Sequence, residues 1–531
     1  MSHPVAAPSS TDRRWRVLTV LCIAVFAINV DTTIVNVALP TLVKSLGAST
    51  SSLQWVVDAY NLAFAALVLA AGSLSDRFGR KGALMLGLAI FGAATTAGAF
   101  GTTTGQLIIA RVAMGVGAAI IFPNTLSILT NVFSDRAERA KAIGAWGATT
   151  GMAVAFGPII GGWLLERFWW GSVFVVMAPV ATIAMVLVML FVPASRNPAA
   201  PRLDGLGLGL SSAAVSLLVY TIIEAPGRGW SASGTLLGFA AALVAFIAFV
   251  LWERRVDEPM LDIGLFKNLR FSAASGAISV AYFALFGFIF LITMYFQFMH
   301  GYSPFSTGVR LVPVAIGMGV SSAVGPSLAV RLGNNRVVAG GLAMMAVGFA
   351  WIATSTTDTS YIEMIGQMLV TSAGMGLATA PATEAIMGVI PKEKAGVGAA
   401  VNDANRLLGG TLGVAVIGSV FASIYIRAIA TSKAAAVIPA RVLAQSKDSV
   451  GAALAGAHQL ASFNPHAAGL LNTAAHSAFF DGFRVGCLVA AGVALVGAVF
   501  VAIVLPARPT ESFDLDLLEL RPPEFAVADA S

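Results

Sequence analysis

Four carboxylic acids lie inside long apolar runs of the sequence. They are Asp31, Asp58, Glu384 and Asp403. A charged side chain in hydrocarbon costs several kcal/mol, whereas a polar interior lets a carboxyl group exist in either its neutral or its charged form. We therefore expect these acids to face a cavity or a partner, where they could take up and release protons.

Asp58 is the first candidate for a proton-carrying acid. It follows the start of one apolar run, and Asp31 lies near the end of the preceding run, so two antiparallel helices could bring them together. Two neighbouring carboxyl groups share a proton readily because both cannot ionise cheaply. Arg111 could pair with either acid, or its long side chain could reach the membrane surface. Asp31 could instead be a helix cap.

The two later acids have different surroundings. Asp403 precedes Arg406 by three residues, the spacing at which helical side chains form ion pairs. Glu384 follows Pro381 and could be a substrate or proton site, or a residue at the cytoplasmic end of its helix.

The composition indicates which elements must position these residues. The chain has 531 residues, of which 57% are hydrophobic and 11% charged. A soluble protein carries about 25% charged residues, so lipid is the natural solvent for this chain. Cys22 and Cys487 are far apart, and we expect no disulfide, metal site or cofactor. Neither a nucleophile–base pair nor a phosphate-binding loop is visible, which argues against an enzyme or direct use of ATP.

About fourteen apolar runs are long enough to cross a bilayer as helices. The sequence therefore predicts an all-α integral membrane protein. The runs cover residues 17–39, 53–73, 82–101, 106–130, 140–163, 172–193, 204–223, 234–252, 271–297, 306–329, 337–355, 362–387, 397–424 and 483–505.

Positive charges are concentrated in alternate loops. The set that includes both ends of the chain holds most of the 32 Lys and Arg residues. By the positive-inside rule, both termini are cytoplasmic. The net charge of +6 is thus a topology signal, and we expect no nucleic-acid partner.

A glycine-rich, charged loop separates the second and third runs. Its key residues are Gly72, Asp76, Arg77, Gly79, Arg80 and Lys81. Two glycines permit a tight turn, and Asp76 can cap or pair at a helix end. The loop resembles the signature loop of the major facilitator superfamily, although a simple basic turn would also satisfy the charge rule. Arg111 stands in a run that resembles the fourth-helix motif of that superfamily, with Met114 where glutamine is usual.

The fifth run carries small residues at helical spacing. They are Gly147, Gly151, Gly157, Pro158, Gly161 and Gly162. Such a face allows close helix packing, and the pattern resembles the antiporter motif of the same superfamily. The alternative is the general small-residue packing of membrane helices.

Further matches point to one subfamily. The segments 31–40, 54–60, 297–313 and 395–413 resemble those of fourteen-helix drug:proton antiporters. The match is poor at the second copy of the signature loop, where Val330 replaces the acid, and over residues 425–482.

The resemblance implies the major facilitator fold, with two six-helix bundles facing a central cavity and two extra membrane helices between them. The expected parts are a cytoplasmic N-terminus (1–16), a first bundle (17–193), a linker with the extra helices (194–270), a second bundle (271–505) that includes a long outer segment (425–482), and a cytoplasmic tail (506–531).

The resemblance also implies a function. The expected activity is proton-coupled antiport that exports drugs or other amphipathic small molecules by alternating access. The alternative is a specific exporter of a metabolite, siderophore or antibiotic on the same fold. Aromatic residues near the expected cavity, such as Tyr282 and Phe286, would suit cationic substrates.

The expected setting is a bacterial cytoplasmic membrane, with the proton gradient as the driving force in place of a cofactor. Partners would be the substrate, protons and the lipid bilayer. A periplasmic adaptor would join them in a Gram-negative cell, and the chain would otherwise be a monomer.

Overall fold

The computed structural model describes residues 10–133, 135–196, 204–257, 259–261, 263–390 and 395–507. Within these ranges the secondary structure is helical, with no strand. Thirteen of the described helices are long and apolar enough to cross a membrane. α14 (Tyr361–Val389), which covers the predicted run 362–387, has 29 residues but is less apolar and is not one of the thirteen. The all-α membrane fold predicted from the sequence is therefore confirmed.

The first helices of the chain pack as one group. The group comprises α1 (Ser10–Leu46), α2 (Thr50–Phe78), α3 (Arg80–Ala99), α4 (Thr104–Val132), α5 (Arg136–Arg167), and the short α6 (Ser172–Val175) that leads into α7 (Met177–Phe191). α2 and α3 both pack against α4, while α1 packs against α5.

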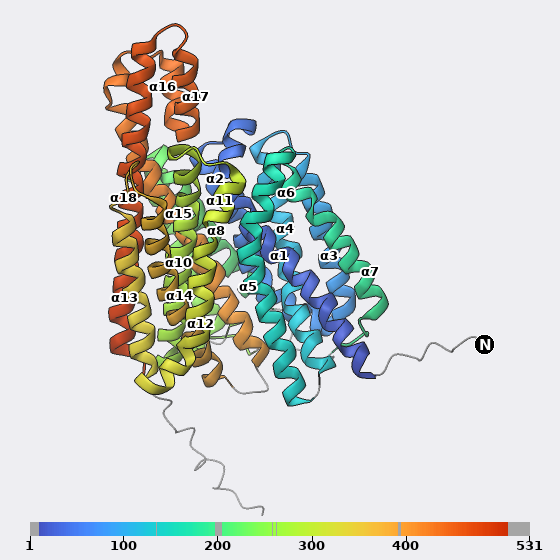
Figure 1. The fold of residues 1–531 in the computed structure, drawn as a ribbon. Helices are drawn as coiled ribbons and strands as arrows, with labels where there is room; N and C mark the ends of the chain where they lie inside the picture. The colour runs from blue at the N-terminus through green and yellow to red at the C-terminus, as the bar shows by residue number, and fades with distance from the viewer. Residues whose placement is uncertain are drawn as a thin grey trace, which may run out of the picture.

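The later helices form a second group. It comprises α10 (Leu269–Met294), which continues as a π-helical turn (Tyr295–Met299), the short α11 (Pro304–Arg310), α12 (Val312–Leu332), α13 (Asn334–Ile352), α14, α15 (Ala395–Ala430) and α18 (Pro465–Val504). Figure 1 shows the two groups on opposite sides of the bundle. The domain boundaries given by the sequence stay a prediction.

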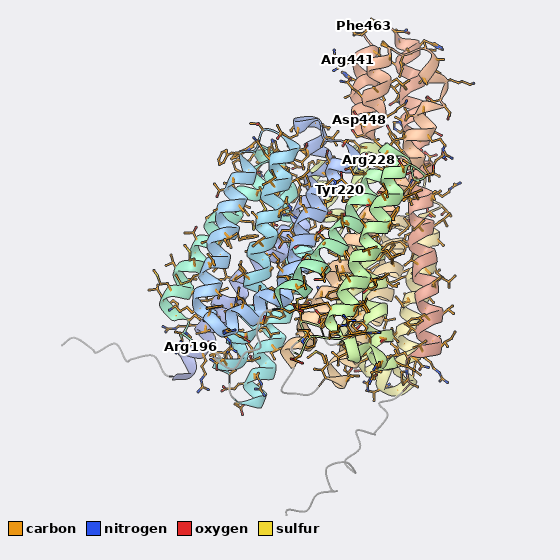
Figure 2. The ribbon with its side chains drawn as sticks, turned by 180° about the vertical axis from the view of Figure 1, so that it is seen from behind. Arg196, Tyr220, Arg228, Arg441, Asp448 and Phe463 are labelled. Atoms are coloured by element: carbon orange, nitrogen blue, oxygen red, sulfur yellow. The ribbon has the colours of Figure 1, made fainter. Side chains whose placement is uncertain are left out.

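The bundle has two distinct ends (Figure 1). α1 begins and α18 finishes at the end that we call the terminal side. α16 (Ala440–Asp448) and α17 (Val450–Leu460) lie at the opposite end, which we call the hairpin side. In Figure 2, Phe463 marks the tip of the hairpin side and Arg196 lies near the terminal side.

Several helices begin at a side chain that accepts a hydrogen bond from the first turn. Ser49 accepts from the backbone N–H of Ser52 at the start of α2, and Thr103 accepts from Gln106 at the start of α4. A capping oxygen of this kind satisfies a backbone donor that would otherwise have no partner. These caps fix where each helix enters the bundle.

Glycine pairs bring helices into backbone contact at matching places in the two groups. A Cβ on Gly117 of α4 would lie 2.9 Å from the carbonyl oxygen of Gly87 on α3. In the second group, a Cβ on Gly341 of α13 would lie 2.6 Å from the carbonyl oxygen of Gly374 on α14. Small residues of this kind let membrane helices approach closely.

Two further helices, α8 (Gly205–Arg228) and α9 (Ser233–Glu253), form a separate pair. α8 contacts both α2 and α15, so the pair lies beside the junction of the two groups. Trp55 of α2 donates to a carboxylate oxygen of Glu224 at 3.2 Å, and Ser419 of α15 donates to the carbonyl of Ile222 at 2.8 Å.

The segment expected to be a long outer connection, residues 425–482, is mostly helical. α15 continues to Ala430, α16 and α17 form a helical hairpin, and α18 begins at Pro465 rather than near residue 483. The hairpin is anchored because the buried hydroxyl of Tyr425 donates to the carbonyl of Ser446 at 3.0 Å. The predicted tail at 506–531 lies outside the described residues from position 508 onward.

Candidate functional site

The structure joins two of the predicted site residues in a buried ion pair. Arg111 of α4 donates from Nη1 to Oδ2 of Asp31 on α1 at 2.5 Å. Both side chains are essentially inaccessible to solvent, at 1% and 0% exposed. The arginine therefore does not reach the surface of the protein, and Asp31 is not a helix cap.

Other contacts hold the guanidinium group of Arg111 in place. Its Nε donates to the carbonyl of Val56 on α2 at 2.8 Å, and its carbon lies 4.3 Å from the ring centre of Tyr60. Nη1 also lies 3.7 Å from the sulfur of Met114. The pair thus ties α1, α2 and α4 together on the hairpin side of the bundle.

Asp58 lies in the same region but has a different environment. Its side chain on α2 is fully buried, and neither carboxylate oxygen has a hydrogen-bond partner among the described residues. The structure therefore pairs Asp31 with Arg111 rather than with Asp58. An ionised carboxylate without donors is strongly disfavoured in a protein interior, so this environment accommodates the neutral acid.

The second group of helices holds its own ion pair. Arg406 donates to Asp403 at 3.3 Å within α15, and the guanidinium lies 4.8 Å from the ring centre of Tyr282 on α10. The predicted pairing of Asp403 with Arg406 is present. Arg406 itself is thus the cation over Tyr282, one of the aromatic residues proposed for substrate binding. Glu384 of α14 is exposed and is joined to none of the other predicted acids.

The loop between α2 and α3 contains an ion pair of its own. Asp76 binds Arg80 at 2.6 Å and accepts from the hydroxyl of Ser127 on α4 at 2.9 Å. Gly79 has a φ of 121°, which residues with a side chain rarely adopt. Lys81 donates to the carbonyl of Met189 at 2.9 Å, whereas Arg77 is exposed. Every contact described here stays within the first group, so in this state the loop does not bridge the two groups.

The glycines of α5 divide into two sets. A Cβ on Gly157 or Gly161 would collide with α1, at 2.0 Å from Thr33 Oγ1 and 2.5 Å from Ile34 Cγ1 respectively. A Cβ on Gly162 would lie 2.5 Å from the backbone of Phe305 on α11. In contrast, a Cβ on Gly147 or Gly151 would meet nothing within 4 Å. Among these glycines of α5, the three that pack closely are therefore those toward the hairpin side.

The contact between α5 and α11 is reciprocal. A Cβ on Gly308 would lie 2.2 Å from the carbonyl oxygen of Pro158. Gly308 lies in the segment 297–313, which the sequence linked to the family without assigning a contact. The residues around Gly308 do not indicate which helix it packs against. The structure adds Gly308 to the residues that hold the two groups together.

Gln54 also holds the two groups of helices together. Its fully buried amide donates to the carbonyls of Val414 and Ala415 on α15, both at 3.0 Å. Gln297 likewise donates across the groups to Val37 at 2.9 Å. The described polar contacts between the two groups thus lie toward the hairpin side.

Comparisons with known proteins agree with this architecture. Residues 21–414 match the model of the Major Facilitator Superfamily. The bacterial homologue of the human lysosomal transporter Spinster, solved in an inward-facing and unoccupied conformation, shares the fold with a TM-score of 0.64 at 16% identity. The match covers 93% of this chain and 98% of that one.

Similar curated proteins include efflux pumps. The multidrug efflux pump LfrA of Mycolicibacterium smegmatis is 32% identical over 93% of this chain and 98% of its own. The methyl viologen resistance protein SmvA of Salmonella typhimurium is 35% identical, over 88% and 93% respectively. The tetracenomycin C resistance and export protein of Streptomyces glaucescens is 32% identical, over 94% and 93%. The family match, the shared fold and these relatives together show that the chain is a membrane transporter, not an enzyme, and that it belongs to the Major Facilitator Superfamily.

Proposed function

We propose that this transporter is a proton-coupled antiporter that exports amphipathic drugs. The observation that carries the proposal is the pair of acids on the hairpin side. Asp58 is buried with no donor among the described residues, while Asp31, in the same helical group, is neutralised by Arg111. When Asp58 is protonated, this region contains no unpaired charge, because Asp31 is already paired with Arg111. Asp58 can therefore hold one exchangeable proton.

In this proposal Asp58 carries the proton. Arg111 contacts the carbonyl of Val56, which precedes Asp58 by two residues on α2. When α2 moves relative to α4, water or substrate would reach the carboxyl group and favour its ionised form. Substrate and proton would then compete for one state of the protein, which is the basis of antiport.

The packing supports alternating access between two sides. Cross-group contacts close the hairpin side through Gln54 and Gly162, whereas Gly147 and Gly151 have open space beside them. If the hairpin side is extracytoplasmic, as the positive-inside rule predicts, this state is open to the cytoplasm. Both termini would then lie in the cytoplasm.

The decisive experiment compares Asp58→Asn with the wild-type protein in inside-out vesicles that carry a proton gradient. We expect the variant to insert normally but to lose dye transport against a concentration gradient. Asp257→Asn is the control, since Asp257 is an exposed acid outside the helices. Concentrative transport by Asp58→Asn would show that Asp58 is not the coupling acid.

A second measurement tests coupling itself. Adding substrate to the purified protein in weak buffer should release protons from the wild type and not from Asp58→Asn. If the wild type releases no protons at any pH, proton-coupled antiport is excluded. Glu384→Gln, tested in the same way, would reveal whether this exposed acid contributes.

The second candidate is a dedicated exporter of one natural product. A specific observation favours it, because one relative is named as a tetracenomycin C resistance and export protein. Measuring excretion of native metabolites beside dye efflux separates the two functions. Transport of a single compound, with no effect on unrelated dyes, would support the dedicated exporter.

The remaining features of the proposal follow from this activity. The chain would lie in a bacterial cytoplasmic membrane, with the proton gradient as its energy source and without a cofactor. It would act as a monomer, with a periplasmic adaptor as a partner if the cell has an outer membrane. Blue-native electrophoresis of the extracted protein, with and without crosslinking, tests both expectations.

A further inference from the structure

A hollow lined mainly by residues with polar side chains lies on the hairpin side, apart from the acids and glycines described above. It has a volume of about 520 Å³, and its lining combines the loop between α13 and α14 with one face of α18. Pockets for small molecules commonly have volumes of about 300–1,000 Å³. The lining includes Thr356, Asn472, Thr473, His476, Asp481 and Arg484.

The two charged residues of the hollow do not neutralise each other. Asp481 and Arg484 are three residues apart on α18 and exposed, yet no ion pair joins them among the described contacts. Asp403 and Arg406 have the same spacing on α15 and do pair, at 3.3 Å. An acid and a base held apart in one hollow suit a ligand that carries both charges.

The loop that forms the other wall is held firmly. The hydroxyl of Tyr295 donates to the carbonyl of Thr356 at 2.9 Å, and the buried Ser355 donates to Gln367 at 3.2 Å. Nε of Arg484 donates to the carbonyl of Ala353 at 3.4 Å, a contact that ties the guanidinium group to this loop. The guanidinium is thus positioned before any ligand arrives.

The level of the hollow matches a membrane interface. The membrane-length helix α13 ends at Ile352, just before the loop, and the exposed Trp351 marks the kind of position that aromatic residues take at membrane surfaces. Toward the terminal side, the packed helices α13 and α18 expose an apolar surface that includes Val347, Leu488 and Leu495. A molecule seated in the hollow could therefore extend acyl chains along these helices.

We propose that this hollow binds the headgroup of a zwitterionic phospholipid, with its phosphate on Arg484 and its ammonium on Asp481. The hydroxyl group of Thr356, in the loop that also contacts Arg484, would add a contact to a phosphate oxygen. A primary ammonium fits better than a trimethylated one, because it can donate hydrogen bonds to the carboxylate. The assignment is therefore phosphatidylethanolamine, and it is independent of the proton-coupling proposal.

The test uses the full-length protein, purified in detergent and examined by native mass spectrometry with added phosphatidylethanolamine, phosphatidylcholine or phosphatidylglycerol. We expect the wild type to retain phosphatidylethanolamine most strongly. Arg484→Gln should weaken retention of all three lipids by about tenfold, because it removes a charge-assisted contact to phosphate. Asp481→Asn should remove the preference for the ethanolamine lipid without abolishing binding.

Controls separate this site from general lipid contact. Arg441→Gln removes an exposed arginine of the hairpin and should leave retention unchanged. Equal retention of lipid by the wild type and Arg484→Gln would overturn the proposal. So would full displacement of the lipid by soluble phosphoethanolamine at low concentration, because the ligand would then be a free metabolite.

Discussion

The two groups of helices share a backbone plan but differ in where they place charge. Gly79 and Gly333 both have positive φ, at 121° and 94°, at the same point between two helices. The residue after each glycine donates to the chain beyond the last helix of its group, Arg80 to Ser195 at 3.0 Å and Asn334 to Ala507 at 2.9 Å. The two loops therefore have equivalent folds.

Their chemistry is not equivalent. The first loop carries Asp76 bound to Arg80, whereas the corresponding residues of the second loop are Val330, which is 81% exposed, and Asn334. The first group also holds the fully buried pair of Asp31 and Arg111, while the second group's pair is partly exposed. A repeated backbone can thus carry an asymmetric function, since turns and glycine contacts set the fold while a few charges set the chemistry.

The largest expected effect comes from breaking the buried pair in the first group. Arg111→Met leaves Asp31 buried and unpaired, which should lower stability by about 3–5 kcal/mol. Arg406→Met in the second group should cost less, about 1 kcal/mol, because this pair is partly exposed whereas the pair of Asp31 and Arg111 is fully buried. Thermal unfolding in detergent measures both. Equal losses of stability in the two variants would contradict the difference between the two ion pairs. Adding Asp31→Asn to Arg111→Met should recover part of the stability, because the unpaired carboxylate is then removed.

The next effect concerns the contact between the groups. Gly162→Ala places a methyl group against the backbone of α11, which should cost about 1–3 kcal/mol in the state closed at the hairpin side. Gly151→Ala is the matched control, because open space surrounds that position. With Thr307→Cys introduced as a buried reporter on α11, a thiol-labelling reagent added from the hairpin side should react more readily in Gly162→Ala. Similar labelling in both variants would contradict the prediction.

Because the two loops have equivalent folds, the acid can be removed from the first loop and introduced at the equivalent position of the second. Asp76→Asn should lower stability by about 1 kcal/mol and slow transport, because Arg80 loses the carboxylate that it binds. The range of substrates should not change. Val330→Asp should have little effect, since Asn334 offers no positive charge to the new acid. A changed substrate range in Asp76→Asn would mean that the loop takes part in recognition.

The smallest effect is a pH dependence in the second group. Burial and the nearby Arg310 hold the pKa of His300 below its usual range. The unfolded chain therefore binds more protons than the folded one below about pH 6.5, so stability should fall as the pH drops through that region. His300→Gln should reduce this loss between pH 7.5 and pH 5.5 in thermal unfolding. An unchanged pH profile would contradict the assignment.

The sequence predicted the helices well because lipid imposes a simple length and polarity rule. It failed at the start of α18, since residues 465–482 lie beyond the stretch that must be apolar and therefore carry no hydropathy signal. In the structure, α18 begins at Pro465 and packs against α17.

The sequence named the candidate residues of the first group but did not decide their contacts, and their role in transport stays a prediction. Asp31, Asp58 and Arg111 were all identified, yet the sequence could not decide which acid binds the arginine. Helix ends are uncertain by about 2–4 residues in sequence-based reasoning, which amounts to a full turn of helix. A shift of that size changes which side chains meet. For the same reason, the sequence could not separate Gly147 and Gly151 from the glycines that pack closely.

The helical hairpin of α16 and α17 has a practical consequence for visualising this molecule. It extends beyond the bundle and leads directly into α18, which runs without a break from Pro465 to Val504 (Figures 1 and 2). An antibody fragment raised against the hairpin would therefore move rigidly with the last membrane helix. Such a fragment would supply the alignment mark that electron cryomicroscopy needs for a protein with so little mass outside the detergent micelle.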